Sequence, residues 1–279
     1  MNYNAGVPAE LISPELADLV TERLTATEEL LKQTCKAEIE FINEMTTHLM
    51  AAGGKRFRPL ITILAATLGD ASKIEVIKAA VVIELTHLAT LYHDDVMDEA
   101  QLRRGAQSAN ARFGNAAAIL TGDFLFARAS ELVADLGPAA VKLQAQTFER
   151  LVTGQLLETV GPAAGVDAVD HHINVLAEKT GSLIATAAQF GAEFSGAAES
   201  EVIAMRNFGE AIGIAFQLTD DIIDLTSIAE ESGKAPGTDL LEGVPTLTTL
   251  LIQQANKAED QELINRLRNQ VTPELLPSL

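Results

Sequence analysis

Residues 74–98 read IEVIKAAVVIELTHLATLYHDDVMD, a run that is apolar around most of a helix before it ends in a group of aspartates. A helix that is apolar on nearly every side packs inside a bundle rather than on its surface. Residues 208–223 have the same character, and elsewhere apolar residues recur three and four positions apart, which is the α-helical period. Alternating strand patterns are scarce and aromatic residues make up only 4% of the chain. The sequence therefore predicts an all-α protein.

Turn signals built from glycine, proline and serine divide the chain into about ten helical segments. No repeat of fixed period links these segments. With 47% hydrophobic and 21% charged residues, the 279-residue chain can bury a large core. We therefore expect one large helical domain or two modest ones.

The composition is strongly acidic, with 39 Asp and Glu against 20 Lys and Arg and a formal net charge of −19. Nucleic acids and anionic membranes would repel such a chain, so neither is expected as a partner. The single cysteine, Cys35, excludes an intrachain disulfide framework and a multi-cysteine zinc site. The first 20 residues lack a signal-peptide pattern, and no apolar run reaches the roughly 20 residues of a membrane span. A cytoplasmic protein is expected.

The pattern DDxxD occurs twice, as DDVMD from Asp94 to Asp98 and as DDIID from Asp220 to Asp224. Residues four apart share a helix face, so the outer aspartates of each copy form a pair. Such carboxylates at the end of an apolar helix repel one another unless a cation compensates, and Mg²⁺ with oxygen ligands suits them. Because Mg²⁺ prefers one or two carboxylates together with phosphate oxygens, two pairs predict a metal-bridged phosphate ligand. A single acidic cluster is more often a solvated face, but two copies are hard to explain by chance.

The few basic residues lie close to these motifs in the sequence. GGKRFRP at residues 53–59 places three cations beside a glycine pair and just before a helix N-terminus, which favours anions. Arg103 and Arg104 follow the first motif, Lys179 lies in another helical segment, and Lys234 follows the second motif. Each alone is more readily a solvated surface charge, but together with two acidic motifs they suit a phosphate-bearing ligand.

In this order, the motifs resemble those of the trans-isoprenyl diphosphate synthases, also called polyprenyl synthetases. The resemblance extends from residue 53 to about residue 247. It is carried by GGKRFRP (53–59), HDDVMDEAQLRRG (93–105), GD (122–123), GQ (154–155), KT (179–180), FQLTDDIID (216–224) and GKAPGTDL (233–240). It implies a single catalytic domain over residues 1–279, a bundle of about ten or more helices around a deep central cavity.

The resemblance also implies the reaction, a head-to-tail condensation of isopentenyl diphosphate with an allylic diphosphate, by a homodimeric enzyme. Three Mg²⁺ ions would grip the allylic diphosphate. Asp94, Asp98 and Asp220 would hold the metals, and Asp224 would ligate a metal directly or through water. Asp95 and Asp221 would act mainly through water or neighbouring side chains.

The basic residues would divide between the two substrates. The allylic diphosphate would be clamped by Arg103, Lys179 and Lys234, with Thr180 and Gln217 alongside. Isopentenyl diphosphate would be seated by Lys55, Arg58, His87 and Arg104. The groups that act in catalysis would be Asp94, Asp95, Asp98, Asp220, Arg103, Lys179 and Lys234.

This assignment agrees with the chemistry of the reaction. Departure of diphosphate from the allylic carbon creates negative charge that metals and cations stabilise more in the transition state than in the ground state. Apolar walls that exclude water protect the allylic cation until the isopentenyl double bond attacks. The proton that is then lost goes to the departing diphosphate, and no covalent nucleophile is needed.

Product length depends on which side chains block the growing chain. Ala89, five residues before Asp94, and its neighbour Thr90 are small. In the family, a small alanine at this position is typical of synthases that make long products. The resemblance therefore implies a polyprenyl diphosphate of about C30 or longer, which would be a precursor of a quinone side chain. The alternative is a floor formed by Phe124, Phe126 or Phe148, which leaves a C20 product open.

Two features depart from the family pattern. GVPTL at residues 243–247 stands where the family often has GKxTLP, so Val244 replaces a diphosphate-binding lysine. The sequence also stops about 30 residues after Leu247, where relatives usually continue with further helices, so we expect a trimmed C-terminus.

Asp123, in an apolar run, is expected to be a buried hydrogen-bonding carboxylate rather than a ligand.

Two other functions compete with this one. A class I terpene cyclase also ionises an allylic diphosphate, but it carries a different second motif and needs no isopentenyl site. A non-catalytic partner subunit or acidic interaction protein typically lacks one aspartate motif. Both motifs and GGKRFRP are intact here, which favours the synthase.

Overall fold

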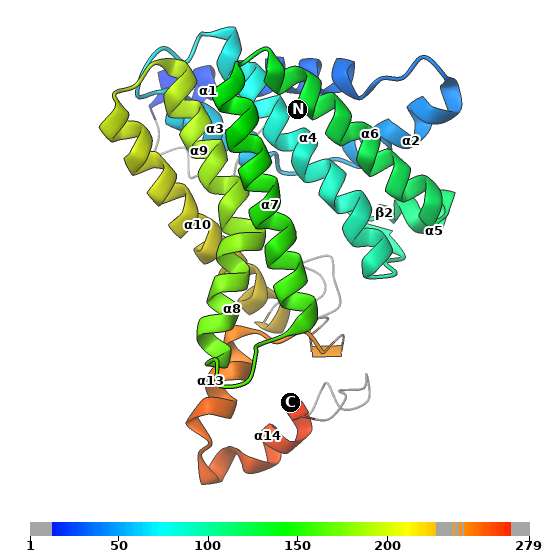
Figure 1. Ribbon diagram of the computed structural model, residues 1–279, viewed down its shortest axis with the longest axis vertical. Coiled ribbons are helices and arrows are strands. Elements are labelled where there is room, and N and C mark those ends of the chain that lie inside the picture. The colour runs from blue at the N-terminus through cyan, green and yellow to red at the C-terminus, as the bar shows by residue number, and fades with distance from the viewer. Residues whose placement is uncertain (1–12, 227–236, 238–239, 242, 269–279) are drawn as a thin grey trace. The chain divides into compact units, whose positions relative to one another are not determined.

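The computed structural model of the chain describes residues 13–226, 237, 240–241 and 243–268 (Figure 1). This part is helical almost throughout, so the predicted all-α class is confirmed. Within it, no helix has the length and apolar character needed to cross a bilayer. The helices are α1 (Pro14–Cys35), α2 (Glu40–Ala51), α3 (Phe57–Ala66), α4 (Ile74–Met97), α5 (Ala109–Phe113), α6 (Asn115–Ala134), α7 (Pro138–Val160), α8 (Ala168–Leu176), α9 (Ser182–Ser195), α10 (Glu199–Thr226), α13 (Leu247–Ala255) and α14 (Gln261–Arg268).

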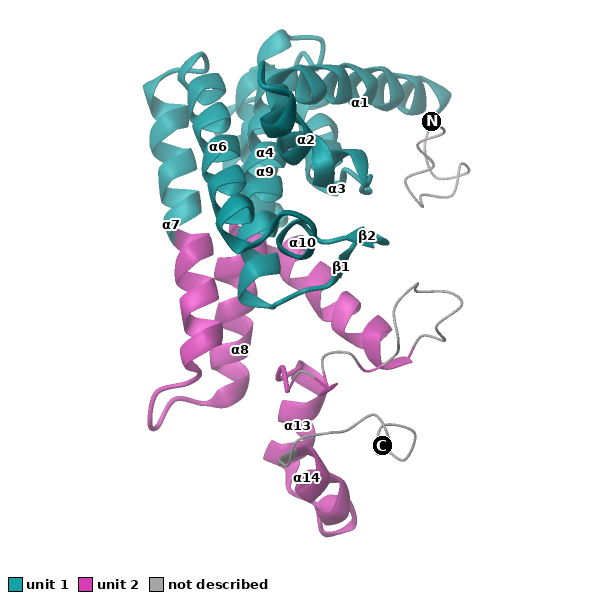
Figure 2. Ribbon diagram, turned by 90° about the vertical axis from the view of Figure 1, so that its right-hand side faces the viewer, with its two compact units in different colours: residues 1–149, 183–209 teal, residues 150–182, 210–279 magenta. Residues whose placement is uncertain are grey.

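The chain forms two compact units (Figure 2). Unit 1 comprises residues 1–149 and 183–209, and unit 2 comprises residues 150–182 and 210–279. Helices α7 and α10 each contribute residues to both units. The first aspartate motif belongs to unit 1 and the second to unit 2, so each motif has its own local surroundings.

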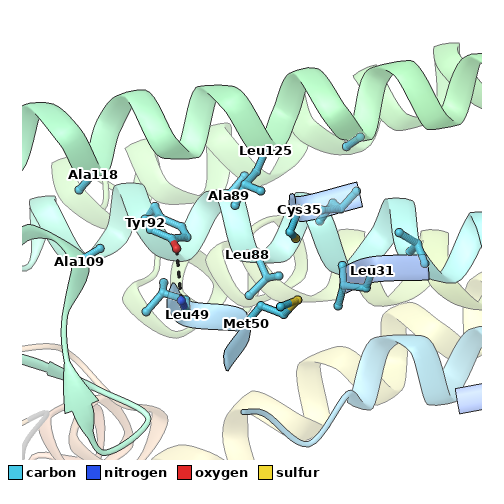
Figure 3. Close-up of a cluster of buried hydrophobic side chains, with 13 residues drawn as sticks. Leu31, Cys35, Leu49, Met50, Leu88, Ala89, Tyr92, Ala109, Ala118 and Leu125 are labelled. Carbon is cyan, nitrogen blue, oxygen red and sulfur yellow. Dashed lines mark hydrogen bonds between the residues drawn. The ribbon is translucent and has the colours of Figure 1, made fainter. Parts of the chain in front are cut away.

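Helix α4 is the central helix of unit 1 and packs against α6, α3 and α1. It is buried along most of its length, as its nearly continuous apolar sequence predicts. Figure 3 shows Ala89 of α4 beside Leu125 of α6 in the main cluster of buried side chains. The hydroxyl of Tyr92 donates to Met45 O at 2.5 Å and accepts from the Leu49 N–H at 3.2 Å, which fixes α2 on α4.

A short hairpin follows α4, with β1 (Leu102–Arg103) antiparallel to β2 (Ala106–Gln107). Its two turn residues, Arg104 and Gly105, both have positive φ, at 55° and 75°. Two-residue hairpin turns favour this conformation because its twist matches that of the flanking strands. The sequence pattern did not predict this hairpin, which sets the directions of Arg103 and Arg104.

In unit 2, α8 continues into a π-helical turn, Ala177–Gly181, before α9 begins. This turn carries Lys179 and Thr180. Gly154 of α7 lies against it so closely that a Cβ at position 154 would overlap the backbone of Lys179. The glycine of the GQ motif therefore permits close packing of α7 on the turn.

Candidate active site

The first aspartate motif occupies the last turn of α4. Asp94 is partly buried, and Asp98, at the helix end, exposes 54% of its side chain. Asp95 is fully buried, and its Oδ1 accepts a hydrogen bond from Arg103 Nε at 2.6 Å. Arg103 Nη2 also lies 3.8 Å from Asp98 Oδ2. The hairpin arginine therefore bridges the buried carboxylate and the exposed one.

The other oxygen of Asp95 fits a metal environment. Its Oδ2 is buried and has no hydrogen-bond partner among the residues that the structure describes. Leaving a buried acceptor unsatisfied costs about 1–3 kcal/mol, so such an oxygen calls for a water molecule or a cation. Carboxylate oxygens are the ligands that Mg²⁺ prefers, and a Mg²⁺ ion with its bound water would complete this group.

The second motif lies in the last turns of α10. Asp221 is buried, and its Oδ1 accepts from Gln217 Nε2 at 3.2 Å. Gln217 Oε1 in turn accepts from the hydroxyl of Thr180 at 3.3 Å. His172 Nε2 lies 3.7 Å from Asp221 Oδ2. The predicted partners Thr180 and Gln217 thus form one hydrogen-bonded chain that ends on the motif.

The two motifs share a local arrangement. In each copy the second aspartate is buried and held by a neighbouring side chain, whereas Asp98 and Asp220 are exposed. Over the described ranges, no three His, Cys, Asp or Glu side chains come together as a ready metal site. One or two accessible carboxylates from each motif match a Mg²⁺ ion that takes its other ligands from phosphate and water.

Lys179 is paired with a carboxylate rather than left exposed. Its Nζ forms an ion pair with Glu158 Oε2, and the same oxygen accepts from Gln155 Nε2 at 3.1 Å. These two partners lie on α7, one turn apart, which explains why the GQ and KT motifs occur together. Lys179 itself belongs to the π-helical turn. Such turns are rare in proteins, and those that occur are frequently found at functional sites.

Arg56, which had no predicted role, organises the GGKRFRP loop. It is buried, with Nε 2.8 Å from Glu28 Oε2 and Nη1 3.1 Å from Glu84 Oε1. A side chain at Gly54 would meet the guanidinium groups of both Arg56 and Arg104 at 2.9 Å. The sequence held one signal for this pairing, because Glu84 interrupts an apolar run and a buried carboxylate requires a cation.

Arg58, His87 and Arg104, the predicted isopentenyl diphosphate residues, belong to this same group in unit 1. Burial lowers the pKa of His87 well below its usual 6.5, and the charges of Arg58 and Arg104 lower it further. Burial also lowers the pKa of both arginines and raises the pKa of Glu84. Arg58 Nε is buried without a hydrogen-bond partner in the described part of the chain. An anion here would relieve both the desolvation and the mutual repulsion of the cations.

The remaining predicted residues have varied surroundings. Lys55 is exposed, and Lys234 lies outside the described residues. Ala89 has no accessible surface, and Thr90 is buried with its hydroxyl donating to His87 O at 2.8 Å. Both therefore lie in packed surroundings within unit 1.

The expectation that Asp123 is buried is wrong. Its side chain is 60% exposed, with Oδ1 3.4 Å from His93 Nε2. The buried member of the GD motif is Gly122, where a Cβ would overlap the ring of His93. The apolar run around Asp123 indicated burial, but the face of α6 that turns toward α4 carries Gly122 and not its neighbour.

Known proteins that are similar to this chain are prenyl diphosphate synthases. The family model described as polyprenyl synthetase matches residues 39–275. The chain is 53% identical over 226 residues to nonaprenyl diphosphate synthase of Mycobacterium tuberculosis, which covers 80% of this chain and 67% of that protein. It is 39% identical over 232 residues to heptaprenyl diphosphate synthase component 2 of Geobacillus stearothermophilus, with 83% and 72% covered.

A solved structure is similar over nearly the whole fold. It is geranylgeranyl pyrophosphate synthase of Corynebacterium glutamicum, complexed with calcium and isoprenyl diphosphate. The TM-score is 0.84 at 46% sequence identity, and the match covers 95% of this chain and 82% of that one.

Proposed function

The chain belongs to the polyprenyl synthetase family and is a prenyltransferase, and from this premise we propose that it makes a long-chain trans-polyprenyl diphosphate. The reaction condenses isopentenyl diphosphate with an allylic diphosphate, head to tail. The observation that carries the proposal is the matched pair of DDxxD motifs, each with a buried, anchored second aspartate and more accessible outer ones. We also retain two predictions made from the sequence, a single catalytic domain over residues 1–279 and a cytoplasmic location.

Three Mg²⁺ ions are proposed as the cofactor, held by Asp94, Asp98, Asp220 and Asp224. The orphaned Asp95 Oδ2 and the all-oxygen donor set support this choice. When bound, Mg²⁺ neutralises the charge that develops on the departing diphosphate. Arg103 contributes a second positive charge there and is held in place by Asp95.

The two diphosphates are proposed to bind different groups of residues. Lys179 would exchange Glu158 for the allylic diphosphate, with Thr180 and Gln217 beside it and Lys234 as a further cation. Isopentenyl diphosphate would bind Lys55, Arg58, His87 and Arg104. The depressed pKa of His87 keeps its imidazole neutral at physiological pH, so it donates one hydrogen bond without adding charge.

A product of about C30 or longer is supported by the small side chains of Ala89 and Thr90. The similarity to a nonaprenyl diphosphate synthase points the same way, whereas the similar solved structure is that of a geranylgeranyl enzyme. Sizing the products made from labelled isopentenyl diphosphate tests the proposal. A sole product of C15 or C20 would overturn the long-chain assignment.

The same assay with and without isopentenyl diphosphate tests the alternative functions. A synthase releases diphosphate from the allylic substrate only when isopentenyl diphosphate is present, whereas a cyclase releases it without the second substrate. No release at all would indicate a non-catalytic partner subunit. One similar protein is named as component 2 of a heptaprenyl diphosphate synthase, so this outcome is tested as well.

A homodimer is proposed as the assembly. Ile119 and Leu120 on α6 expose apolar side chains next to each other, a surface that a second subunit would cover. Light scattering on the purified chain is expected to give twice the monomer mass of 29.7 kDa. A monomer that gains activity only with a second polypeptide would contradict this.

A further inference from the structure

Arg150 of α7 binds two carboxylates from two other segments of unit 2. Its Nε lies 2.9 Å from Glu178 Oε2 and its Nη2 lies 2.8 Å from Glu178 Oε1, a two-point contact. The same Nη2 lies 2.5 Å from Glu210 Oε1 of α10. All three side chains are partly buried. One guanidinium therefore joins α7, the π-helical turn and α10.

The π-helical turn is the segment that carries Lys179 and Thr180, directly after Glu178. Thr180 reaches Gln217, which lies about two helical turns beyond Glu210 on α10. A Cβ at Gly181 would lie 3.4 Å from Glu210 O, so the turn packs directly on α10 at the position of Glu210. The contact with Arg150 thus holds together the two segments, the turn and α10, whose side chains form the hydrogen bonds from Thr180 through Gln217 to Asp221.

We propose that Arg150 is a positioning residue for the allylic diphosphate, because its guanidinium fixes the turn that presents Lys179 and Thr180. This rests on the proposed function, which assigns Lys179 to that diphosphate. A planar guanidinium suits the task because it makes two parallel hydrogen bonds to one carboxylate and still reaches a second.

Loss of Arg150 has a definite physical consequence. Glu178 and Glu210 both contact Nη2, so without it two carboxylates face each other and repel. The hydrogen bonds and charges of these glutamates raise the pKa of Arg150, so the guanidinium is charged at every physiological pH. The turn packs on α10 at Glu210, so repulsion between Glu178 and Glu210 would push the turn away from α10 and shift Lys179 relative to the second motif, which α10 carries.

Steady-state kinetics of the enzyme tests this role. We expect Arg150→Ala to raise the KM for the allylic diphosphate at least about ten-fold and to leave the KM for isopentenyl diphosphate unchanged. Arg150→Lys keeps the charge but loses the two-point contact, so it recovers part of the loss. The exposed Arg206 on α10 provides the matched control, because Arg206→Ala removes an arginine outside this contact. Equal changes in both KM values would overturn the proposal.

Binding of inorganic diphosphate with Mg²⁺, measured by calorimetry, gives a readout that does not require turnover. Arg150→Ala and Lys179→Ala should each weaken binding, and the double variant should lose little more than either single one. Additive losses, or no loss for Arg150→Ala, would overturn the positioning role. If the wild type makes no prenyl product and the coupling is still seen, the proposed function fails and the positioning role stands. Should Arg150→Ala fail to fold, Arg150→Lys carries the same comparison.

Discussion

Arg103 Nε donates to Asp95 Oδ1 at 2.6 Å, and Asp95 has no accessible surface. The pair joins the hairpin after α4 to the middle of the first aspartate motif. Arg103 is itself 28% exposed, so it can turn one face to a ligand while Nε holds Asp95. The corresponding aspartate of the second motif, Asp221, is held by Gln217 instead. One motif is therefore anchored by a charge and the other by an amide.

Removing Arg103 should destabilise the fold as well as the site. Arg103→Met leaves the Asp95 carboxylate buried without a counter-ion, and losing one partner of such a pair costs about 3 kcal/mol of unfolding free energy. Urea denaturation measures the change. Lys55→Met, at an exposed lysine, is the control and should shift stability by less than about 0.5 kcal/mol. Equal stability of the two variants would show that water reaches Asp95.

Gly54 and Gly53 offer a matched test of the loop. Both have positive φ, at 143° and 96°, but only a Cβ at Gly54 meets Arg56 and Arg104. Gly53→Ala should cost about 1–2 kcal/mol in backbone strain alone. Gly54→Ala should in addition displace both guanidinium groups and raise the KM for isopentenyl diphosphate about ten-fold. Similar kinetics for the two variants would contradict the link from the loop to Arg104.

Stability should depend on pH through His87. Its folded-state pKa lies well below the ordinary value of 6.5, so the unfolded chain takes up the proton first as pH falls. The stability contributed by neutral His87 is complete above pH 6.5 and is lost below it, with a slope of up to about 1.4 kcal/mol per pH unit.

Denaturation between about pH 7.5 and 5.5 should show a smaller loss for His87→Gln than for the wild type. His171→Gln removes a histidine outside this group of residues and should keep the wild-type slope. Parallel curves for wild type and His87→Gln would mean that His87 is solvated in the folded state.

The proposed metal site predicts different effects for two exposed aspartates, because Asp220 is a proposed ligand and Asp123 is not. Asp220→Asn removes a proposed ligand and should lower kcat/KM about 100-fold, because charge on the departing diphosphate is no longer neutralised. Asp123→Asn, also at an exposed aspartate, should stay close to the wild-type value. Removing Mg²⁺ with a chelator should abolish turnover, and adding it back should restore turnover. A large defect in Asp123→Asn would place that residue at the metals.

Product length should respond to bulk at position 89. Ala89→Phe is expected to shorten the product, and because Ala89 is packed the extra ring should also cost about 1–3 kcal/mol of stability. Chromatographic sizing of the prenyl chains reports the first effect and thermal melting the second. Ala204→Phe, at an exposed alanine of α10, is the control. A destabilised variant with an unchanged product would show that Ala89 has a packing role only.

Local pattern alone determined several features of this chain. The apolar run at residues 74–91 predicted a buried central helix, because burial on every side requires apolar residues on every side. The repeated DDxxD spacing predicted paired carboxylates near a metal, because residues four apart share a helix face. Both inferences need only the geometry of one helix, which neighbouring sequence specifies.

Tertiary structure decided which side chains meet. Arg56 pairs with Glu28 and Glu84 from two other helices, and Arg150 joins three segments that are distant in sequence. The burial of Gly122 and exposure of Asp123 likewise depend on how α6 packs against α4. Spacing within a helix fixes which residues share a face, but the partner of that face is set by long-range packing, so only the folded chain identifies the contacts that hold each motif.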